Sequence, residues 1–458
     1  ASAGHNGAGG GGGAAPSPPM LDARISADGR LVGFVWDREL YVVATDGRSL
    51  PVQVTRGARG TELTNGLADY LAQEEMDRYE GYWISTDASM VAFEQVDESR
   101  VPQYRIMHQG SDRVGEGAQE DHHYPFAGHT NPTVRLGVAA CAEGAAVTWF
   151  DLTQRFGPDM YLNRVKWLYD GTLLIQVQNR EQTQLEVLRL HPLTGLVRPV
   201  LLESNEAWIN LHHMLTPLKQ APQFIWASEA TGYMHLYLYD LEGGLVRQLT
   251  SGEWAVEEIK AVDEAAGLVY FLGTKSGWLE RHLYRVPLAG GPVEQVTRTA
   301  GMHNVVVGRR RRLFVDHYSS AEQPFRVEVC SLADGAEVRT LFVNSDPRLA
   351  RLALQPPTFF TTPSTDGRVL LQGAYLLPDA AVFGPGPYPT VVSTYGGPHV
   401  QTVSNSWAVT ADLRCQFLRA QGYLVIKLDN RGSSRRGLVF EAPIKGDMGR
   451  LEVDDQAA

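Results

Sequence analysis

The stretch from Ile25 to Thr55 reads ISADGRLVGFVWDRELYVVATDGRSLPVQVT and contains three short apolar runs separated by turn signals. Asp-Gly pairs precede the first and third runs, and Trp-Asp-Arg-Glu separates the first run from the second. Runs rich in Val, Leu and aromatic residues, divided by Asp-Gly turns, predict antiparallel strands joined by hairpins. The stretch therefore predicts one blade of a β-propeller.

Looser copies of this pattern follow along the chain. Their starts are about 45 residues apart, or about 60 where there are insertions, which is typical of propeller repeats and fits a sandwich or a solenoid less well. We count about six such repeats. The sequence predicts a mainly β fold in which residues 20–354 form an incomplete propeller with about six visible blades.

A second domain is predicted over residues 355–458. Phe359 to Asp379 contains two strand-like runs around a turn, and Val391 to Thr394 is a continuous apolar run that predicts a buried strand. An amphipathic helix and another apolar strand follow, within residues 412–434. A strand, a helix and a strand with a glycine-rich loop at a strand end are typical of the start of an α/β-hydrolase domain.

Composition narrows the class of protein. The 458 residues have a formal net charge of -11 and no basic stripe, which argues against a nucleic-acid partner, and the run Arg309 to Arg312 is predicted to be a hairpin turn. Cys141, Cys330 and Cys415 lie far apart, so we predict no disulfide framework, no metal site and a reducing compartment. No apolar run reaches about 18 residues, so no membrane-spanning helix is predicted.

The first 19 residues are almost entirely Gly, Ala, Ser and Pro. Such a segment cannot bury enough apolar surface to offset its ordering entropy. We predict that residues 1–19 are disordered.

Two adjacent acids, Glu74 and Glu75, lie in the run from Asn65 to Gly81, which predicts one short helix between two strand-rich regions. Asn65 is a typical N-cap residue, and Gly81 is a typical stop residue. Neighbouring residues on a helix point about 100° apart, so the two carboxylates can share a ligand only where the helix end overhangs a cavity. The alternative is a solvated face on which Glu74 pairs with Arg78.

Several motifs, in order along the chain, resemble those of the dipeptidyl peptidase IV family. The likeness is greatest to the cytoplasmic branch, which contains dipeptidyl peptidases 8 and 9 and their plant and algal relatives. The motifs are QEEMDRYEGYWIS, FEQVDESRVPQYRIMHQG, DHHYPFAGHTNPTVRLGV, WASEATGYMHLYLYD, VYFLGTKSGWLERHLY, STYGGPHVQ and LDNRGSSRRGLVFE.

The resemblance implies a serine peptidase that removes N-terminal dipeptides with Pro, or Ala, at the second position. Glu74 and Glu75 would bind the free amino terminus of the peptide, and the Tyr395 hydroxyl would donate to the oxyanion. The resemblance implies no cofactor, a homodimer for the full-length protein, a cytoplasmic location and eight blades, of which one or two would precede residue 1.

The expected nucleophile motif is not found in the chain. A G-x-S-x-G elbow exposes the catalytic serine in α/β-hydrolases, and the nearest sequence, GSSRRG from Gly432, has its second glycine one position late. The resemblance places the serine, the acid and the histidine after residue 458. We therefore expect these residues alone to be inactive.

Two other functions stay open. One is a non-catalytic propeller that serves as a protein-binding scaffold. The other is a serine peptidase of the acylaminoacyl or prolyl oligopeptidase type, which is not expected to have a helix with two adjacent glutamates between blades.

Overall fold

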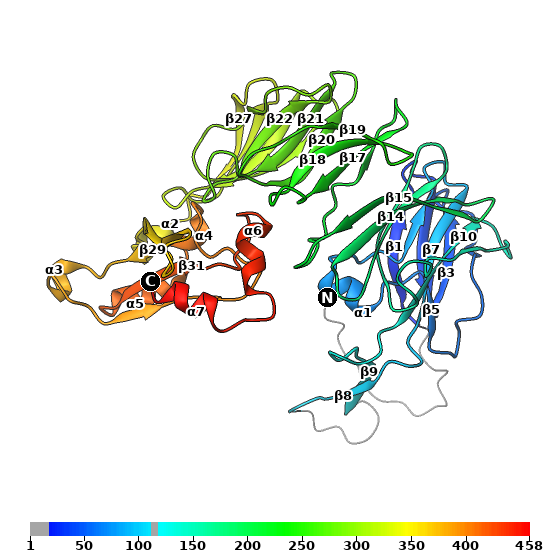
Figure 1. Ribbon diagram of the computed structural model, residues 1–458, viewed down its shortest axis with the longest axis horizontal. Helices are drawn as coiled ribbons and strands as arrows, with labels where there is room; N and C mark the ends of the chain where they lie inside the picture. Colours follow the sequence, from blue (N-terminus) through cyan, green and yellow to red (C-terminus); the bar gives the residue numbers. More distant parts are fainter. Residues whose placement is uncertain (1–17, 111–117) are drawn as a thin grey trace. The chain divides into compact units, whose positions relative to one another are not determined.

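The computed structural model describes residues 18–110 and 118–458. The chain divides into two compact units, one made of residues 1–180 and 185–199 and the other of residues 181–184 and 200–458. Figure 1 colours the elements of both units along the sequence. The predicted disordered segment 1–19 lies, except for residues 18 and 19, outside the described residues.

The first unit is built from antiparallel sheets. One sheet has the order β1-β2-β3-β4, and the next has the order β11-β10-β7-β5 with β6 also paired to β7. The third has the order β12-β13-β14-β15, and its last strand crosses into the second unit. The strands are β1 (Met20–Ile25), β2 (Leu31–Trp36), β3 (Glu39–Ala44), β4 (Val52–Gln53), β5 (Leu63–Asn65), β6 (Tyr82–Ile84), β7 (Met90–Asp97), β10 (Thr133–Ala140), β11 (Thr148–Phe150), β12 (Tyr161–Trp167), β13 (Leu173–Gln178), β14 (Gln184–His191) and β15 (Leu196–Ser204).

Apolar side chains fill the space between neighbouring sheets. Val35 and Leu40 of the first sheet pack with Tyr82 and Phe93 of the second, and all four are almost completely buried. A larger cluster joins the second sheet to the third. Because side chains alternate between the two faces of a strand, the repeated short apolar runs can pack against the sheets on both sides.

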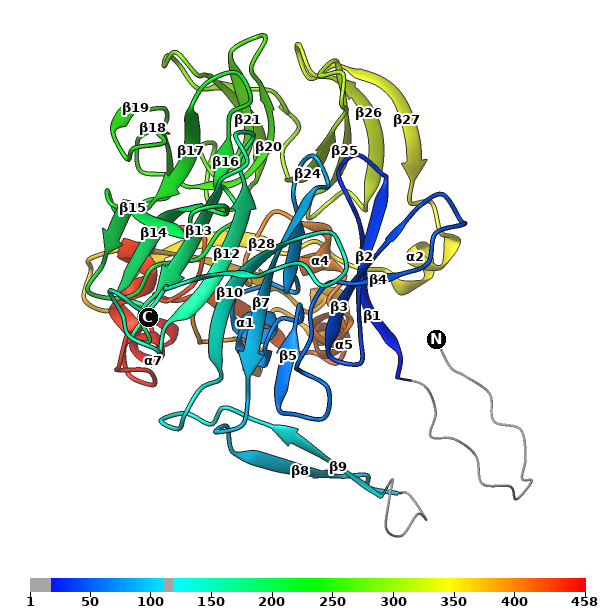
Figure 2. The same cartoon turned by 90° about the vertical axis from the view of Figure 1, so that its right-hand side faces the viewer.

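A two-stranded hairpin interrupts the second sheet. Its strands β8 (Gln103–Met107) and β9 (Gln119–His123) pair only with each other, while β7 pairs along its whole length with β10. The hairpin projects away from the sheets of this unit in both views (Figure 1 and Figure 2). Tyr124, just after β9, contacts Tyr70 with ring centroids 5.1 Å apart.

The second unit contains three further four-stranded antiparallel sheets, each in sequential order. Among the described residues this gives six blade-like sheets, which confirms the predicted mainly β fold with about six blades. The strands are β16 (Thr216–Pro217), β17 (Gln223–Ser228), β18 (His235–Asp240), β19 (Leu245–Gln248), β20 (Val256–Asp263), β21 (Leu268–Gly273), β22 (His282–Pro287), β23 (Glu294–Gln295), β24 (Met302–Val307), β25 (Leu313–Ser319), β26 (Arg326–Ser331) and β27 (Glu337–Val343).

The same unit ends in a mixed α/β layer. Its sheet has the order β28-β29-β31-β30, with β30 parallel to β31. The elements are α2 (Pro347–Leu352), β28 (Thr358–Pro363), β29 (Leu370–Leu376), α3 (Ala380–Phe383), β30 (Thr390–Val392), α4 (Trp407–Thr410), α5 (Leu413–Ala420), β31 (Leu424–Asp429), α6 (Leu438–Glu441), a 3-10 turn (Ala442–Ile444) and α7 (Leu451–Gln456). The layer agrees with the predicted start of an α/β-hydrolase fold.

One strand of this layer differs from the prediction. The sequence predicts a buried strand over Val391 to Thr394, but β30 covers only Thr390–Val392, and its residues are exposed or half-buried. The reason is its position, because β30 is the last strand in the sheet order and has a neighbour on one side only.

Smaller predictions can also be compared with the structure. The basic run Arg309 to Arg312 forms the turn between β24 and β25, as predicted. The three cysteines are unpaired. Across residues 18–110 and 118–458, no helix is long and apolar enough to cross a membrane, and no group of three or more His, Cys, Asp or Glu side chains is placed to hold a metal ion.

Candidate functional site

The two adjacent acids lie at the end of a helix that is shorter than predicted. Helix α1 covers only Tyr70–Glu75, so the expected helix from Asn65 to Gly81 is wrong at both ends. Asp69 caps it, and its Oδ1 accepts a hydrogen bond from the Ala72 amide at 3.1 Å. Ala72 and the C-cap residue Met76 are buried, so one face of this single turn and a half is held against the sheet.

The residues expected to end the helix have other roles. Asn65 belongs to β5, and its buried side chain donates to Glu39 at 2.9 Å. Gly81 lies where two backbone segments cross, because a Cβ atom there would be 2.5 Å from the backbone of Gly66 and Leu67. Both residues are therefore explained by contacts with distant parts of the chain.

The Glu74 and Glu75 side chains are exposed in the last turn of α1. Among the described residues, neither carboxylate has a hydrogen-bond or ion-pair partner. The pKa of Tyr70 is raised by a hydrogen bond with Tyr124 and by burial, and the negative charges of Glu74 and Glu75 add to this shift. Two carboxylates that lack internal partners are available to a cation from outside.

The solvated-face alternative expects Glu74 to pair with Arg78, and this pair does not form, although both acids, Glu74 and Glu75, are exposed. Arg78 forms a two-pronged ion pair with Glu94, at 2.8 and 2.9 Å, and both side chains are almost completely buried. Burial raises the pKa of Glu94 to about 7, whereas the charge and the hydrogen bonds of Arg78 act in the opposite direction. Because a guanidinium keeps its proton and both carboxylate oxygens accept from it, we favour the ionised pair.

The second predicted site residue, Tyr395, lies in the second unit. It follows β30 in a loop, and the residue is 59% exposed. Gly396 adopts a φ of +83°, a backbone conformation that favours glycine. Tyr395 therefore has a free surface in a loop whose turn is set by the glycine after it.

A strand-end motif holds this loop in place. Asn430 donates through Nδ2 to the Gly396 carbonyl at 3.2 Å, and the His399 amide donates to the Gly432 carbonyl at 3.2 Å. Arg431 is fixed in turn by ion pairs with Asp455 and Asp366, both at 2.7 Å. Sequence reasoning treated this LDNRG motif only as a family marker and missed that it anchors the Tyr395 loop.

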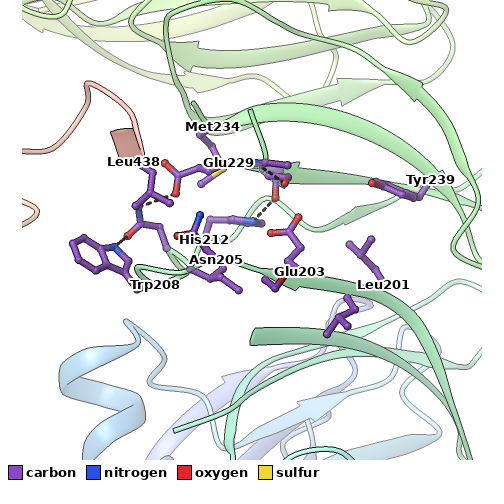
Figure 3. Close-up of a pocket in the computed structure, with 16 residues that line it drawn as sticks. Leu201, Glu203, Asn205, Trp208, His212, Glu229, Met234, Tyr239 and Leu438 are labelled. Atoms are coloured by element: carbon purple, nitrogen blue, oxygen red, sulfur yellow. Dashed lines mark hydrogen bonds between the residues drawn. The ribbon is translucent and has the colours of Figure 1, made fainter. Parts of the chain in front are cut away.

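An acidic cavity in the second unit was also missed. Its volume is about 290 Å³, and Glu203, Glu229, His212 and Trp208 are among the residues that line it (Figure 3). The Asn210 amide donates to Glu229 at 2.9 Å and to Glu441 of α6 at 3.0 Å. In the sequence, Glu229 is marked only as part of the motif WASEATGY. No local pattern connects it to Glu441, which is more than two hundred positions away.

Burial raises the pKa of both carboxyls of this pair. Burial and the neighbouring Glu441 raise the pKa of Glu229 to about 8, and burial raises the pKa of Glu441 to about 7. Because both carboxyls accept from one amide nitrogen, two negative charges would lie close together in a poorly solvated place. Both carboxyls therefore bind protons more readily than exposed glutamates do. The Asn210 amide, which donates to both, links Glu229 of the blade β16–β19 to Glu441 of the α/β layer.

Comparison with known protein families identifies the family to which the chain belongs. Residues 13–325 match the family described as the dipeptidyl peptidase IV N-terminal region, and residues 409–458 match the prolyl oligopeptidase family. The chain belongs to the dipeptidyl peptidase IV family. This confirms the resemblance that the motifs indicate.

Individual relatives agree with the family. Human dipeptidyl peptidase 8 is 30% identical over 472 residues, which cover 85% of this chain and 52% of the relative. A probable dipeptidyl peptidase 4 of Aspergillus flavus is 27% identical over 464 residues, which cover 95% of this chain and 58% of the relative. The crystal structure of Porphyromonas gingivalis dipeptidyl peptidase 4 superposes with a TM-score of 0.86 at 26% identity, and the match covers 96% of this chain and 61% of that one. The chain thus spans just over half the length of these curated relatives.

Proposed function

We propose that the complete protein is a serine-type dipeptidyl peptidase that removes dipeptides from peptides with a free amino terminus and Pro, or Ala, at the second position. In this proposal the chain supplies the recognition of the amino terminus, through Glu74 and Glu75, and one oxyanion donor, through Tyr395. The observation that carries the proposal is the pair of exposed carboxylates without internal partners at the end of α1. Family membership supports the reaction class.

The chemistry of the amino terminus explains the choice of two acids. A peptide α-amino group has a pKa of about 7.7 to 8.0 and is therefore mostly cationic at neutral pH. Each charge-assisted hydrogen bond from that ammonium to a carboxylate contributes about 1.5 to 3 kcal/mol. Binding at the amino end fixes how many residues reach the scissile bond, so the product is a dipeptide.

A blocked amino terminus should be rejected for the same reason. An N-acetylated peptide is neutral at that end and offers one amide N–H in place of the ammonium donors. It would also remove water from two carboxylates without supplying a cation, which is unfavourable. Endopeptidase activity on internal Pro bonds should be weak as well.

Tyr395 provides the second part of the proposed mechanism. A hydroxyl donor held near the reacting carbonyl stabilises the negative oxygen that develops in the tetrahedral transition state. The anchored loop supports this role, because Asn430 and Gly432 fix the backbone on either side of Gly397. In the proposal, the serine, the acid and the histidine lie outside residues 1–458, and these residues alone do not turn over substrate. Homodimerisation and a cytoplasmic location belong to the same proposal.

The proposal can be tested with amine-blocked substrates. In the complete protein, Glu74→Ala and Glu75→Ala should each lower kcat/KM for a free-amine Gly-Pro amide by about 10- to 100-fold. Hydrolysis of the N-acetyl analogue should stay at its low wild-type level, so the preference for the free amine falls. Glu143→Ala is the matched control, because Glu143 is an exposed acid of the same unit that pairs with Arg56. Wild-type preference in both helix variants would refute the proposed role of the pair.

A further inference from the structure

Arg78 lies three residues after α1, and both of its terminal guanidinium nitrogens, Nη1 and Nη2, donate hydrogen bonds within the first unit. Its Nη1 and Nη2 donate to the two oxygens of Glu94, and Nη2 also donates to the Leu162 carbonyl at 3.0 Å. Nη1 donates to the Glu80 carbonyl as well. The guanidinium carbon lies 5.7 Å from the ring centre of Trp83. One side chain thus joins β7, β12 and the segment that follows the helix.

The same residue is connected directly to the helix. The Arg78 backbone amide donates to the Ala72 carbonyl at 2.9 Å, so the chain turns back onto α1 immediately after Glu75. Met76, between the acids and Arg78, is 5% exposed and contacts the Asn163 amide through its sulfur at 3.7 Å. Asp77 adopts a φ of +49° in this turn. Any shift of Arg78 would therefore be passed to the last turn of α1.

Helix α1 needs such an anchor. A six-residue helix is far below the length at which a helix is stable by itself, which is about 12 to 15 residues. Its N-terminal half is fixed by the Asp69 cap and by the contact of Tyr70 with Tyr124. Its C-terminal half, which carries both acids, is fixed through Met76 and Arg78.

Stability alone does not require a buried ion pair at this place. Apolar side chains of similar volume are often as stabilising as a buried Arg-carboxylate pair, because both charges must lose their hydration. The ion pair instead fixes the orientation of the Arg78 side chain. The planar guanidinium donates two parallel hydrogen bonds to one carboxylate, a fork that allows only one orientation.

We propose that the buried Arg78–Glu94 pair is a positioning device that aims the carboxylates of Glu74 and Glu75 at the substrate ammonium. The inference rests on the proposed function and deepens it. Neither Arg78 nor Glu94 touches the substrate in this account. They act by holding the end of α1 against β7 and β12.

The test uses two substitutions that weaken the fork in the complete protein. Glu94→Gln keeps the size of the side chain but replaces one acceptor oxygen with an N–H donor that faces the guanidinium. Arg78→Lys keeps the positive charge but loses the planar geometry. Because misplacement by about 1 Å can reduce rates by about 100-fold, we expect both variants to lower kcat/KM for a free-amine Gly-Pro amide by about 10- to 100-fold. The loss should appear mainly in KM, together with a weaker preference for the free amine over the N-acetyl substrate.

A matched control separates positioning from stability. Glu186 of β14 is also a buried acid, and it pairs with Arg155 at 2.9 Å. Glu186→Gln should lower the melting temperature while leaving the preference for the free amine unchanged. Hydrogen exchange of the amides of residues 72–78 should become faster in Glu94→Gln and stay as in the wild type in Glu186→Gln. This readout does not depend on catalysis.

These experiments distinguish a failure of the positioning role from a failure of the proposed function. If Glu74→Ala and Glu75→Ala reduce the amine preference but Glu94→Gln and Arg78→Lys lower only the melting temperature, the positioning role is refuted and the proposed function stands. If Glu74→Ala and Glu75→Ala keep the wild-type preference, the proposed function itself fails. If Glu94→Gln does not fold, Arg78→Lys and the hydrogen exchange of residues 72–78 in that variant decide the question.

Discussion

At the scale of single residues, the chain places its proposed chemistry on side chains that have few internal contacts and fixes their neighbours instead. Glu74 and Glu75 are exposed, whereas Met76 and Arg78 beside them are buried. Tyr395 is exposed, whereas Asn430 is almost completely buried. A side chain that must meet a substrate cannot be satisfied internally, so its position has to be set by the residues around it.

The proposed oxyanion role of Tyr395 gives the first residue-level prediction. Tyr395→Phe removes the hydroxyl and keeps the ring, so in the complete protein kcat should fall by about 100- to 1,000-fold with little change in KM. Steady-state kinetics on a Gly-Pro amide measure both values. Tyr423→Phe is a control, because Tyr423 is another partly exposed tyrosine of the same layer. A kcat within about twofold of wild type in Tyr395→Phe would exclude this donor.

The Tyr395 loop also shows which residue roles could be predicted. The glycine pair after a predicted strand indicated the loop and its possible chemistry from local sequence alone. The residues that hold it, Asn430 and Gly432, are more than thirty positions away, and no local pattern connects them to Tyr395. Their role depends on the parallel pairing of β30 with β31, which only the structure reveals.

At the scale of elements, strands were easier to predict than the helix. Alternating apolar residues and Asp-Gly turns act locally, so the six blade-like sheets follow from the sequence. The predicted extent of α1 is wrong because the two residues predicted to end the helix contact distant parts of the chain. Asn65 donates a hydrogen bond to Glu39, and Gly81 leaves room for the backbone of Gly66. Local propensity is overridden where tertiary contacts compete for the same residue.

The backbone crossing at Gly81 gives an element-level prediction. In Gly81→Ala the new methyl group would lie 2.5 Å from the backbone of Gly66 and Leu67, which cannot move as a flexible side chain could. We expect a loss of about 1 to 3 kcal/mol in the free energy of unfolding, measured by urea denaturation of residues 1–458. A change within about 0.5 kcal/mol, as for an ordinary surface substitution, would show that the backbone of Gly66 and Leu67 does not pack this closely against Gly81.

At the scale of the whole molecule, the two compact units carry different parts of the proposed mechanism. The first unit contains Glu74 and Glu75, the proposed site for the amino terminus, and the second contains Tyr395, the proposed oxyanion donor, and the α/β layer. Within the second unit, Asn210 and the carboxyls of Glu229 and Glu441 connect a blade to that layer. The free energy of unfolding of this unit should therefore depend on the protonation of the pair.

The direction of that pH dependence follows from the raised pKa values of about 8 for Glu229 and about 7 for Glu441. Both exceed the value of an unfolded glutamate, about 4.3, so the folded state binds more protons between these values. The stabilisation is fully present below about pH 4.3 and is lost as the pH rises toward 8. We expect the melting temperature of the second unit to be lower at pH 8.5 than at pH 6, by about 2 to 4 °C for each kcal/mol lost. Glu229→Gln should flatten this dependence, and an equal slope in both proteins would show that the pair does not titrate as described.

The most direct test of the central claim is a crystal structure of the complete protein with a bound free-amine peptide that is not cleaved. The account predicts that the peptide ammonium lies within about 2.7 to 3.2 Å of a carboxylate oxygen of Glu74 and of Glu75. An ammonium bound by other groups, with Glu74 and Glu75 still in solvent, would contradict it.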